Sequence, residues 1–322
     1  MKLLTVAAMA FTLLAGSVNA AEQLNAYSIM PEKYASKVFA EFTKDTGVKV
    51  NFMRFSSGEA LARLNAEKKN PQVDVMLGGP ADTYAAGVKE GIFEQYRPKD
   101  SDAIPASLRD PQNHWTGIGI IPLCFLTNTK FLEKNKMHLL DPRYKNNLQM
   151  ADARTSGTAT ERIYSLVKVM GEDPAFAYQK KLNGNIQMYT KSGAGGAMPI
   201  ATGQCGSGIF YIVDALDIQQ QGYPVVITYP KDGVSYGIEA TGIVKNAKNM
   251  DAAKKFVDWA ASKKFADFIV ANKINYVPTR SDVKTSNPLL DLSKINMKDV
   301  DVAWKGEKRK EYTNRWINEV IK

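Results

Sequence analysis

The chain has 322 residues, of which 44% are hydrophobic and 23% are charged, a composition that excludes a chain disordered throughout. Its length suggests two domains or one large domain. The 42 Lys and Arg outnumber the 33 Asp and Glu, which gives a formal net charge of +9 and favours anionic solutes and acidic partners. The basic residues are scattered and accompany no nucleic-acid-binding motif, so no nucleic acid partner is expected.

The first 20 residues have the pattern of a secretory signal peptide. Lys2 precedes an apolar run, and Val18-Asn19-Ala20 is a small-residue cleavage pattern ahead of Ala21. The apolar run is short for a membrane-spanning helix, and no later stretch is apolar for long enough to be one. We therefore expect residues 1–20 to be removed and the mature protein to be exported to the periplasm.

The next hundred residues alternate between strand-like and helix-like segments. The predicted strands are 23–29, 48–55 and 72–79. Apolar and polar residues alternate in 48–55, and 72–79 ends in paired glycines. The predicted helices are 31–47, 56–70 and 81–91. Apolar residues recur at helical spacing in 31–47, and 56–70 has an acid in its first turn. This order predicts a parallel or mixed sheet flanked by helices.

The same alternation returns after a long apolar stretch at 117–129, which is predicted to be a strand crossing between domains. The further predicted strands are 203–213, 224–230 and 236–244, and the predicted helices are 153–171 after an initial loop, 173–185, a helix or helix pair at 250–272, and 310–321. The basic run 305–310, KGEKRK, is interpreted as the solvated start of the last helix.

Together these segments predict an α/β protein with two lobes, each a mixed sheet flanked by helices, joined by hinge strands. We assign 21–122 to lobe 1, completed by about 240–322, and 123–239 to lobe 2. A cleft between two such lobes is where small ligands usually bind.

The stretch TSGTATER, residues 155–162, has two possible roles. Thr158 and Glu161 have the spacing of a capping box, which satisfies two backbone donors at a helix start. The additional Thr155, Ser156 and Gly157 indicate an anion site, because a helix N-terminus presents free N–H groups and partial positive charge.

Three other predicted strand-to-helix junctions share this chemistry. Ser57 and Gly58 follow Ser56 at one helix start, Gly79 belongs to a glycine pair after a strand, and Ser192 and Gly193 follow Lys191. Each junction alone is weak because loops are rich in Gly and Ser. The four together predict a cleft that receives a small anionic solute.

The sequence gives little support for catalysis. Its two histidines, His114 and His138, neighbour no nucleophile motif, and no His, Cys, Asp and Glu cluster has metal-ligand spacing. No cofactor is expected, although a periplasmic phosphoryl hydrolase is an alternative. Cys124 and Cys205 are compatible with a disulfide or with two free buried thiols.

Several segments resemble periplasmic solute-binding proteins of ABC importers, in the extracellular solute-binding family that includes ferric-ion, sugar-phosphate and 2-aminoethylphosphonate binders. The segments that carry the resemblance are 56–96, 153–162, 189–196, 221–259 and 276–280. The resemblance implies a type II two-lobed fold and closure of the lobes around a solute. It also implies delivery to an inner-membrane ABC permease, by a monomer.

The resemblance also suggests which solute to expect. Ferric members use adjacent tyrosines, whereas here Phe210 precedes Tyr211, so a ferric site would have Tyr211, Glu59 and Asp214 as its candidates and is the alternative. Sugar-phosphate members have a His-Asp pair of which only Asp214 matches. A smaller phosphoryl- or phosphonate-bearing solute, with an amine facing Asp214 or Glu239, fits better.

We therefore predict two groups of ligand-binding residues. The anion would be held by Ser57, Gly58, Gly79, Thr155, Ser156, Gly157, Thr158, Ser192 and Gly193. The rest of the solute would be recognised by Tyr27, Ser28, Asp214, Tyr236 and Glu239.

Overall fold

The computed structural model describes residues 22–131, 138–298 and 301–322, so the expected signal peptide at residues 1–20 lies outside it. The strands of the described residues form a mixed sheet in the order β2-β1-β3-β9-β4-β7-β5-β6, and β8 pairs with β4 outside this path. The strands are β1 Gln23–Ser28, β2 Lys49–Arg54, β3 Val75–Pro80, β4 Thr116–Asn128, β5 Leu148–Ala151, β6 Ile186–Thr190, β7 Ser207–Tyr211, β8 Val225–Thr228 and β9 Tyr236–Ile243.

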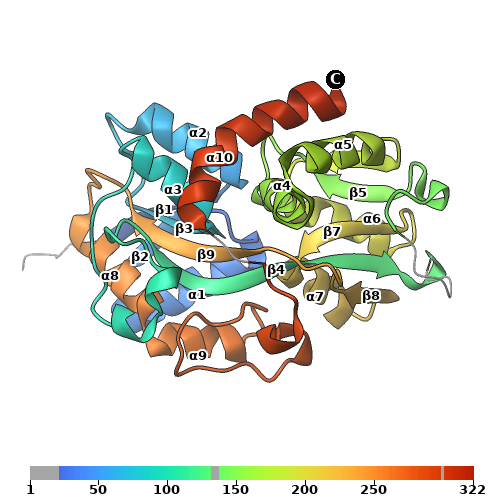
Figure 1. Cartoon of the computed structure of the whole chain (residues 1–322). Helices are drawn as coiled ribbons and strands as arrows, with labels where there is room; N and C mark the ends of the chain where they lie inside the picture. The colour runs from blue at the N-terminus through green and yellow to red at the C-terminus, as the bar shows by residue number, and fades with distance from the viewer. Residues whose placement is uncertain (1–21, 132–137, 299–300) are drawn as a thin grey trace, which may run out of the picture.

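Strand β4 belongs to two halves of this sheet (Figure 1). Its Thr116–Pro122 segment pairs with β9, and its Leu123–Thr127 segment pairs with β7. We call β1, β2, β3 and β9 with the start of β4 the first half, and β5 to β8 with the end of β4 the second half. Twelve of the 13 residues of β4 are buried, which explains its continuous apolar sequence.

Helices follow most of the strands, as the sequence predicts. They are α1 Glu32–Thr46, α2 Ser57–Glu67, α3 Ala81–Lys89, α4 Gly157–Met170, α5 Glu172–Asn183, α6 Ala197–Ala201, α7 Ile212–Gln220, α8 Met250–Ala261, α9 Lys263–Ala271 and α10 Val302–Arg315, followed by the π-helical turn η8 Trp316–Ile321. In α1, Pro31 precedes the first turn and Gly47 ends the helix with φ of 75°, a left-handed conformation that glycine adopts without strain.

Several segments differ from the prediction. The strand expected over 203–213 ends at Tyr211, where α7 begins, because the apolar sequence continues unchanged from strand into helix. Strands β5 and β6 were not predicted from the sequence, and each is only four or five residues long. The expected helix or helix pair at 250–272 is the pair α8 and α9.

The capping box predicted for Thr158 and Glu161 is wrong. Helix α4 begins two residues earlier than this capping box requires, with Ser156 as its N-cap, so Glu161 lies beyond the position at which a capping-box carboxylate reaches back. Its side chain is instead fully buried. Glu161 Oε1 accepts hydrogen bonds from Lys305 Nζ at 2.5 Å and from the Ser235 hydroxyl.

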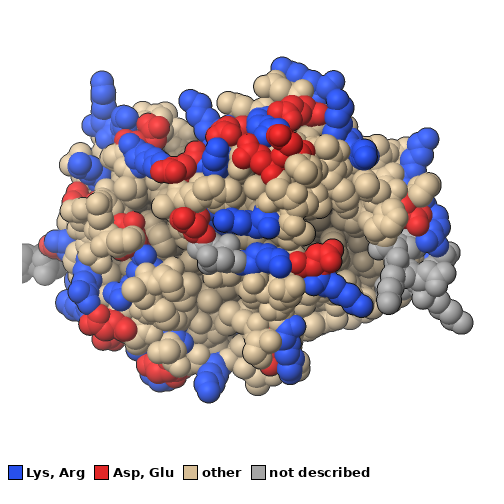
Figure 2. All heavy atoms as spheres, in the orientation of Figure 1, with Lys and Arg blue, Asp and Glu red and all other residues tan. Residues whose placement is uncertain are grey.

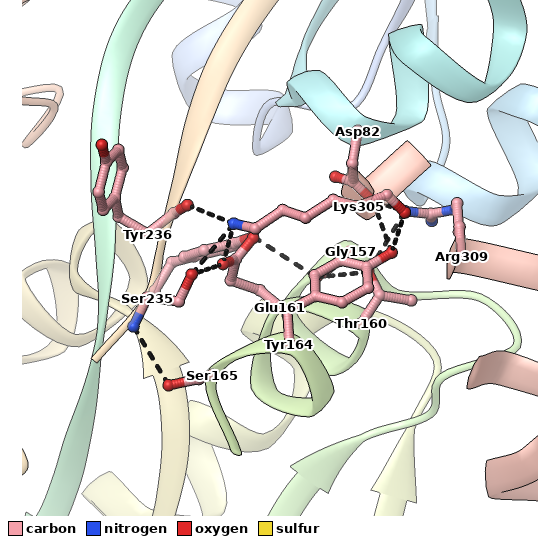
Figure 3. Close-up of polar contacts among 11 residues, drawn as sticks. Asp82, Gly157, Thr160, Glu161, Tyr164, Ser165, Ser235, Tyr236, Lys305 and Arg309 are labelled. Carbon is pink, nitrogen blue, oxygen red and sulfur yellow. Dashed lines mark hydrogen bonds and ion pairs between the residues drawn. The ribbon is translucent and has the colours of Figure 1, made fainter. Parts of the chain in front are cut away.

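The interpretation of 305–310 as a solvated helix start is also wrong for two of its basic residues. Lys305 is 2% exposed, and it also donates to the Tyr236 carbonyl at 3.1 Å. Arg309, likewise buried, pairs with Asp82 of α3 and donates to Thr160 of α4 at 3.2 Å. Figure 3 shows these groups meeting between α3, α4, α10 and the start of β9.

The C-terminal helix therefore contacts both halves of the molecule. Helix α10, in red in Figure 1, packs on α3 of the first half and on α4 of the second, and η8 packs on α5. Tyr312, Trp316 and Val320 share a buried cluster with Tyr164 and Phe176, which matches the predicted apolar face of this helix. The sequence assigned this segment to lobe 1, and the structure shows it touching helices on both sides.

The buried ion pair between Lys305 and Glu161 predicts a large effect of mutation. Lys305→Ala would leave the Glu161 carboxylate buried without its partner, which typically costs about 3–5 kcal/mol of unfolding free energy. The matched control is Lys305→Met with Glu161→Gln, which removes both charges and is expected to recover much of that loss. Urea unfolding measures both variants, and a loss below about 1 kcal/mol for Lys305→Ala would contradict the assignment.

Candidate functional site

Six strand-to-helix junctions surround one small cavity between the two halves. From the first half come Pro31 after β1, Ser57 after β2 and Pro80 at the end of β3. From the second half come Gly157 after β5, Gly193 after β6 and Val213 after β7. Because parallel strands present their carboxyl ends at one edge, and helices begin there, several helix N-termini face a common space.

This cavity has a volume of about 50 Å³ because the two halves touch around it. A Cβ atom on Gly157 would lie 2.7 Å from both Pro80 and the Ser57 hydroxyl, so only glycine fits at this contact. The Gly58 N–H donates to the Thr155 carbonyl across the two halves at 2.8 Å. The structure therefore represents a closed arrangement.

An ion pair also crosses between the halves beside the cavity. Lys191 Nζ lies 2.6 Å from Glu59 Oε1, and Glu59 Oε2 accepts from the Ser56 hydroxyl at 2.7 Å. Burial raises the pKa of Glu59, but the hydrogen bonds from Lys191 and Ser56 outweigh it, so the net pKa lies below its usual value. The α2 N-terminus is thus a capped helix start that also contacts the second half.

Arg54 is a cavity residue that the sequence analysis missed. It ends β2, lines the cavity and is half-buried, and it makes no hydrogen bond or ion pair with the residues that the structure describes. Its positive charge favours the ionised form of Asp214. The sequence contained a signal, because Arg54 lies just before the predicted junction at Ser56, Ser57 and Gly58. The orientation of the Arg54 side chain, however, depends on where β2 ends.

Two carboxyl groups line the same cavity. Glu239 of β9 accepts from the Gly79 N–H at 2.7 Å and from the Tyr276 hydroxyl at 3.0 Å. Loss of hydration raises the pKa of Glu239 to about 7. Loss of hydration, and then repulsion from Glu239, raise the pKa of Asp214 to about 7. Both groups can therefore change charge near neutral pH.

The structure brings most of the predicted binding residues to this cavity. Those that line it are Ser57, Gly79, Ser156, Gly157, Thr158, Ser192, Gly193, Asp214 and Glu239. Gly193 packs closely against Thr158, because a Cβ atom on Gly193 would lie 2.0 Å from the Thr158 hydroxyl oxygen.

Five of the predicted residues lie elsewhere. Gly58 and Thr155 contact each other between the halves, and the Thr155 hydroxyl donates to the Lys191 carbonyl at 2.6 Å. The buried Tyr27 donates its hydroxyl to Glu67 at 2.8 Å, and Ser28 is fully buried. Tyr236 lies near Lys305 Nζ, which is 6.0 Å from the centre of its ring.

Two of the three residues named for a ferric site line the cavity, and the third does not. Tyr211 lines the cavity, and burial raises its pKa well above the usual value. Asp214 lines the cavity too, whereas Glu59 is paired with Lys191 outside it. Among residues 22–131, 138–298 and 301–322, no three His, Cys, Asp or Glu side chains are grouped to hold a metal ion.

The remaining sequence questions have direct answers in the structure. Cys124 and Cys205 are both free and buried, and burial raises the pKa of Cys205 to about 11.

None of the described helices combines the length and the apolar character needed to cross a bilayer. Figure 2 shows acidic and basic side chains interspersed on one face of the molecule, as expected from the scattered charges in the sequence.

A small cavity between two sheet halves joined by β4 and β9 is typical of the class of two-lobed solute-binding proteins. Residues 70–304 match the model of the bacterial extracellular solute-binding protein family, and the chain belongs to this family. Membership of this solute-binding family implies a small solute as ligand and an ABC permease as partner.

Individual relatives cover most of the chain. An uncharacterized protein of Haemophilus influenzae is 32% identical, over 95% of this chain and 92% of its own. A putative 2-aminoethylphosphonate-binding periplasmic protein of Salmonella typhimurium is 27% identical, over 77% and 75% respectively.

Among solved structures, the periplasmic binding protein AfuA of Actinobacillus pleuropneumoniae was determined with exogenous fructose-6-phosphate. It is 33% identical, covers 94% of this chain and 99% of its own, and superposes with a TM-score of 0.88. The expected type II two-lobed fold is confirmed by this similarity.

The raised pKa values of Asp214 and Glu239 predict how the stability of the solute-free protein depends on pH. In the unfolded chain both groups lose their protons near pH 4, while in the folded chain they keep them until about pH 7. The folded state binds more protons in this interval, so unfolding free energy should fall as pH rises from about 4 to about 7.

Thermal melting of solute-free protein between pH 5 and pH 8 measures this fall. The variant Asp214→Asn with Glu239→Gln cannot titrate at these positions and should show a shallower decline in melting temperature. An equal or steeper decline in the variant would show that these two carboxyls are not the groups responsible.

Proposed function

We propose that this protein binds a small phosphoryl- or phosphonate-bearing solute in the periplasm and delivers it to an ABC permease. The observation that carries the proposal is the position of Arg54 beside several helix N-termini at one closed cavity. Arg54 supplies a planar fork of N–H donors that matches a phosphonate, and helix N-termini add backbone donors and positive potential.

The carboxyl groups of Asp214 and Glu239 support a solute that also has an amine. An ammonium group near them would favour their ionised forms, which burial otherwise disfavours. A solute with both charges thus complements Arg54 and the two acids together. The name of the Salmonella typhimurium relative, which specifies 2-aminoethylphosphonate, agrees with this chemistry.

The cavity size also favours a compact solute. About 50 Å³ corresponds to a few water-sized groups, since one water needs roughly 10–15 Å³ on this scale. A hexose phosphate is much larger than 2-aminoethylphosphonate and would hold the halves further apart.

The mechanism would be hinge closure of two lobes around the solute. Lobe 1 would comprise 21–122 with much of 240–322, lobe 2 would comprise 123–239, and β4 and β9 would contain the hinge. The contacts between Lys191 and Glu59 and between Gly58 and Thr155 would form on closing. We further propose that the signal peptide at residues 1–20 directs export, and that the protein acts as a monomer without a cofactor.

Sugar phosphate is the second candidate, because AfuA was solved with fructose-6-phosphate and is similar over nearly the whole chain. Ferric ion is a further alternative, with Tyr211 and Asp214 at the cavity. Visible absorbance on adding iron would identify a tyrosine–iron complex. Turnover of a phosphate ester would instead indicate the hydrolase alternative.

Arg54→Gln should weaken binding of 2-aminoethylphosphonate by about 10- to 100-fold, the usual value of a charge-assisted hydrogen bond. Isothermal titration calorimetry measures the affinity. Arg97→Gln is the matched control, because Arg97 is exposed and pairs with Asp102 away from the cavity. Equal affinities of the wild type and Arg54→Gln would remove Arg54 from the site.

Ser156→Asp should abolish tight binding of the same solute, because it places a negative charge at the N-terminus of α4 where the phosphonate would lie. Ser156→Asn has nearly the same shape without the charge, and it should retain most of the affinity. Calorimetry on both variants separates charge from shape. Similar affinities for Asp and Asn at this position would contradict an anion at the α4 N-terminus.

A further inference from the structure

A second and much larger cavity lies within the second half of the molecule. Its volume is about 820 Å³, within the range of small-molecule sites, and it shares no lining residue with the cleft cavity. Sheet residues Leu123 and Ile209 form one wall, and Leu166 and Met170 of α4 form another. Figure 2 shows a hollow among uncharged side chains on this side of the molecule.

One buried cation lines this apolar cavity. Arg162 of α4 is 3% exposed, and its Nε has no hydrogen-bond partner among the described residues. Its Nη1 donates to the Ala151 carbonyl at 3.2 Å, a neutral acceptor. Burial lowers the pKa of Arg162, yet a guanidinium stays charged at neutral pH.

The charge of Arg162 lacks a carboxylate partner within the part of the chain that the structure describes. Asp152 is the carboxylate whose charge acts on Arg162, and it is bound by Arg154, with 2.5 Å between Arg154 Nη2 and Asp152 Oδ2. A buried charge without a partner is costly, so an anion in the cavity would be strongly favoured.

Three hydroxyl groups at the cavity are already engaged. The Thr127 and Ser207 hydroxyls are 2.8 Å apart, and the Ser165 hydroxyl accepts from the Ser235 N–H at 3.1 Å. The exposed Lys231 and Asp232 also line the cavity, and their opposite charges offset each other. Arg162 therefore leaves one positive charge to balance, and a dianionic phosphate would keep an unbalanced negative charge. A carboxylate with an apolar body matches both features.

We propose that this cavity is a second binding site, for an amphipathic monocarboxylate whose head group contacts Arg162 and whose apolar body packs on α4 and the sheet. The site is independent of the solute in the cleft. It adjoins the hinge, because Gly233 and Val234 line the cavity and lead directly into Ser235 and β9.

Decanoate is the probe, and isothermal titration calorimetry on the full mature protein measures its binding. We expect saturable one-to-one binding that weakens by about 10- to 100-fold in Arg162→Met, which keeps the length of the side chain and removes the charge. Decanol should bind the wild type and Arg162→Met alike, because it has no charge. Absence of saturable decanoate binding, or equal affinity in Arg162→Met, would overturn the proposal.

Two further variants keep the test decisive if Arg162→Met folds poorly. Val169→Trp places a large side chain in the cavity from a half-buried position and should prevent decanoate binding. Arg54→Gln, at the cleft, should leave decanoate binding unchanged. Normal decanoate binding by Val169→Trp, or its loss in Arg54→Gln, would place the carboxylate elsewhere and overturn the site.

Discussion

The constraint on which the site depends is the unpaired backbone at the start of a helix. The first N–H groups of each helix have no partner within it, and they carry partial positive charge. In this fold, parallel strands in both halves of the sheet end at the same gap, so six junctions place their first turns around one cavity. Positive potential at that cavity follows from topology before any side chain is considered.

Glycines and buried ion pairs determine how closely these junctions approach. Gly157 allows α4 to touch Pro80 and Ser57, and Gly193 allows Thr158 to lie against the loop after β6. The other side of α4 is held by Glu161 and Lys305 (Figure 3). The helix whose N-terminus lies at the cavity is thus held on its other side by the C-terminal helix, which also contacts α3 of the first half.

Much of the fold could be predicted from the sequence. Helical and alternating periodicity located α1 to α3, β1 to β3 and the long β4, because each of these elements has a clear apolar pattern. Strands β5 and β6 were missed because they are short, and α7 because its apolar start continues that of β7. The burial of Lys305 and Arg309 could not be predicted, since their partners Glu161 and Asp82 are far away in sequence.

The residues that line the cavity could be predicted from the sequence to a similar extent. Ser and Gly at strand-to-helix junctions correctly indicated residues that meet at one cavity, because topology alone brings such junctions together. Arg54 was missed because its role depends on the end of β2. Gly58 was predicted to bind the anion, but its N–H donates to the Thr155 carbonyl of the other half. This contact depends on the closed arrangement of the two halves.

The central claim is that these junctions hold a negatively charged phosphorus group, and native mass spectrometry tests it most directly. Protein isolated from the periplasm in phosphate-free buffer is weighed intact and again after denaturation, and the released solute is analysed for phosphorus. The account predicts one phosphorus-containing solute per chain. A bound metal ion, or a neutral solute without phosphorus, would contradict it.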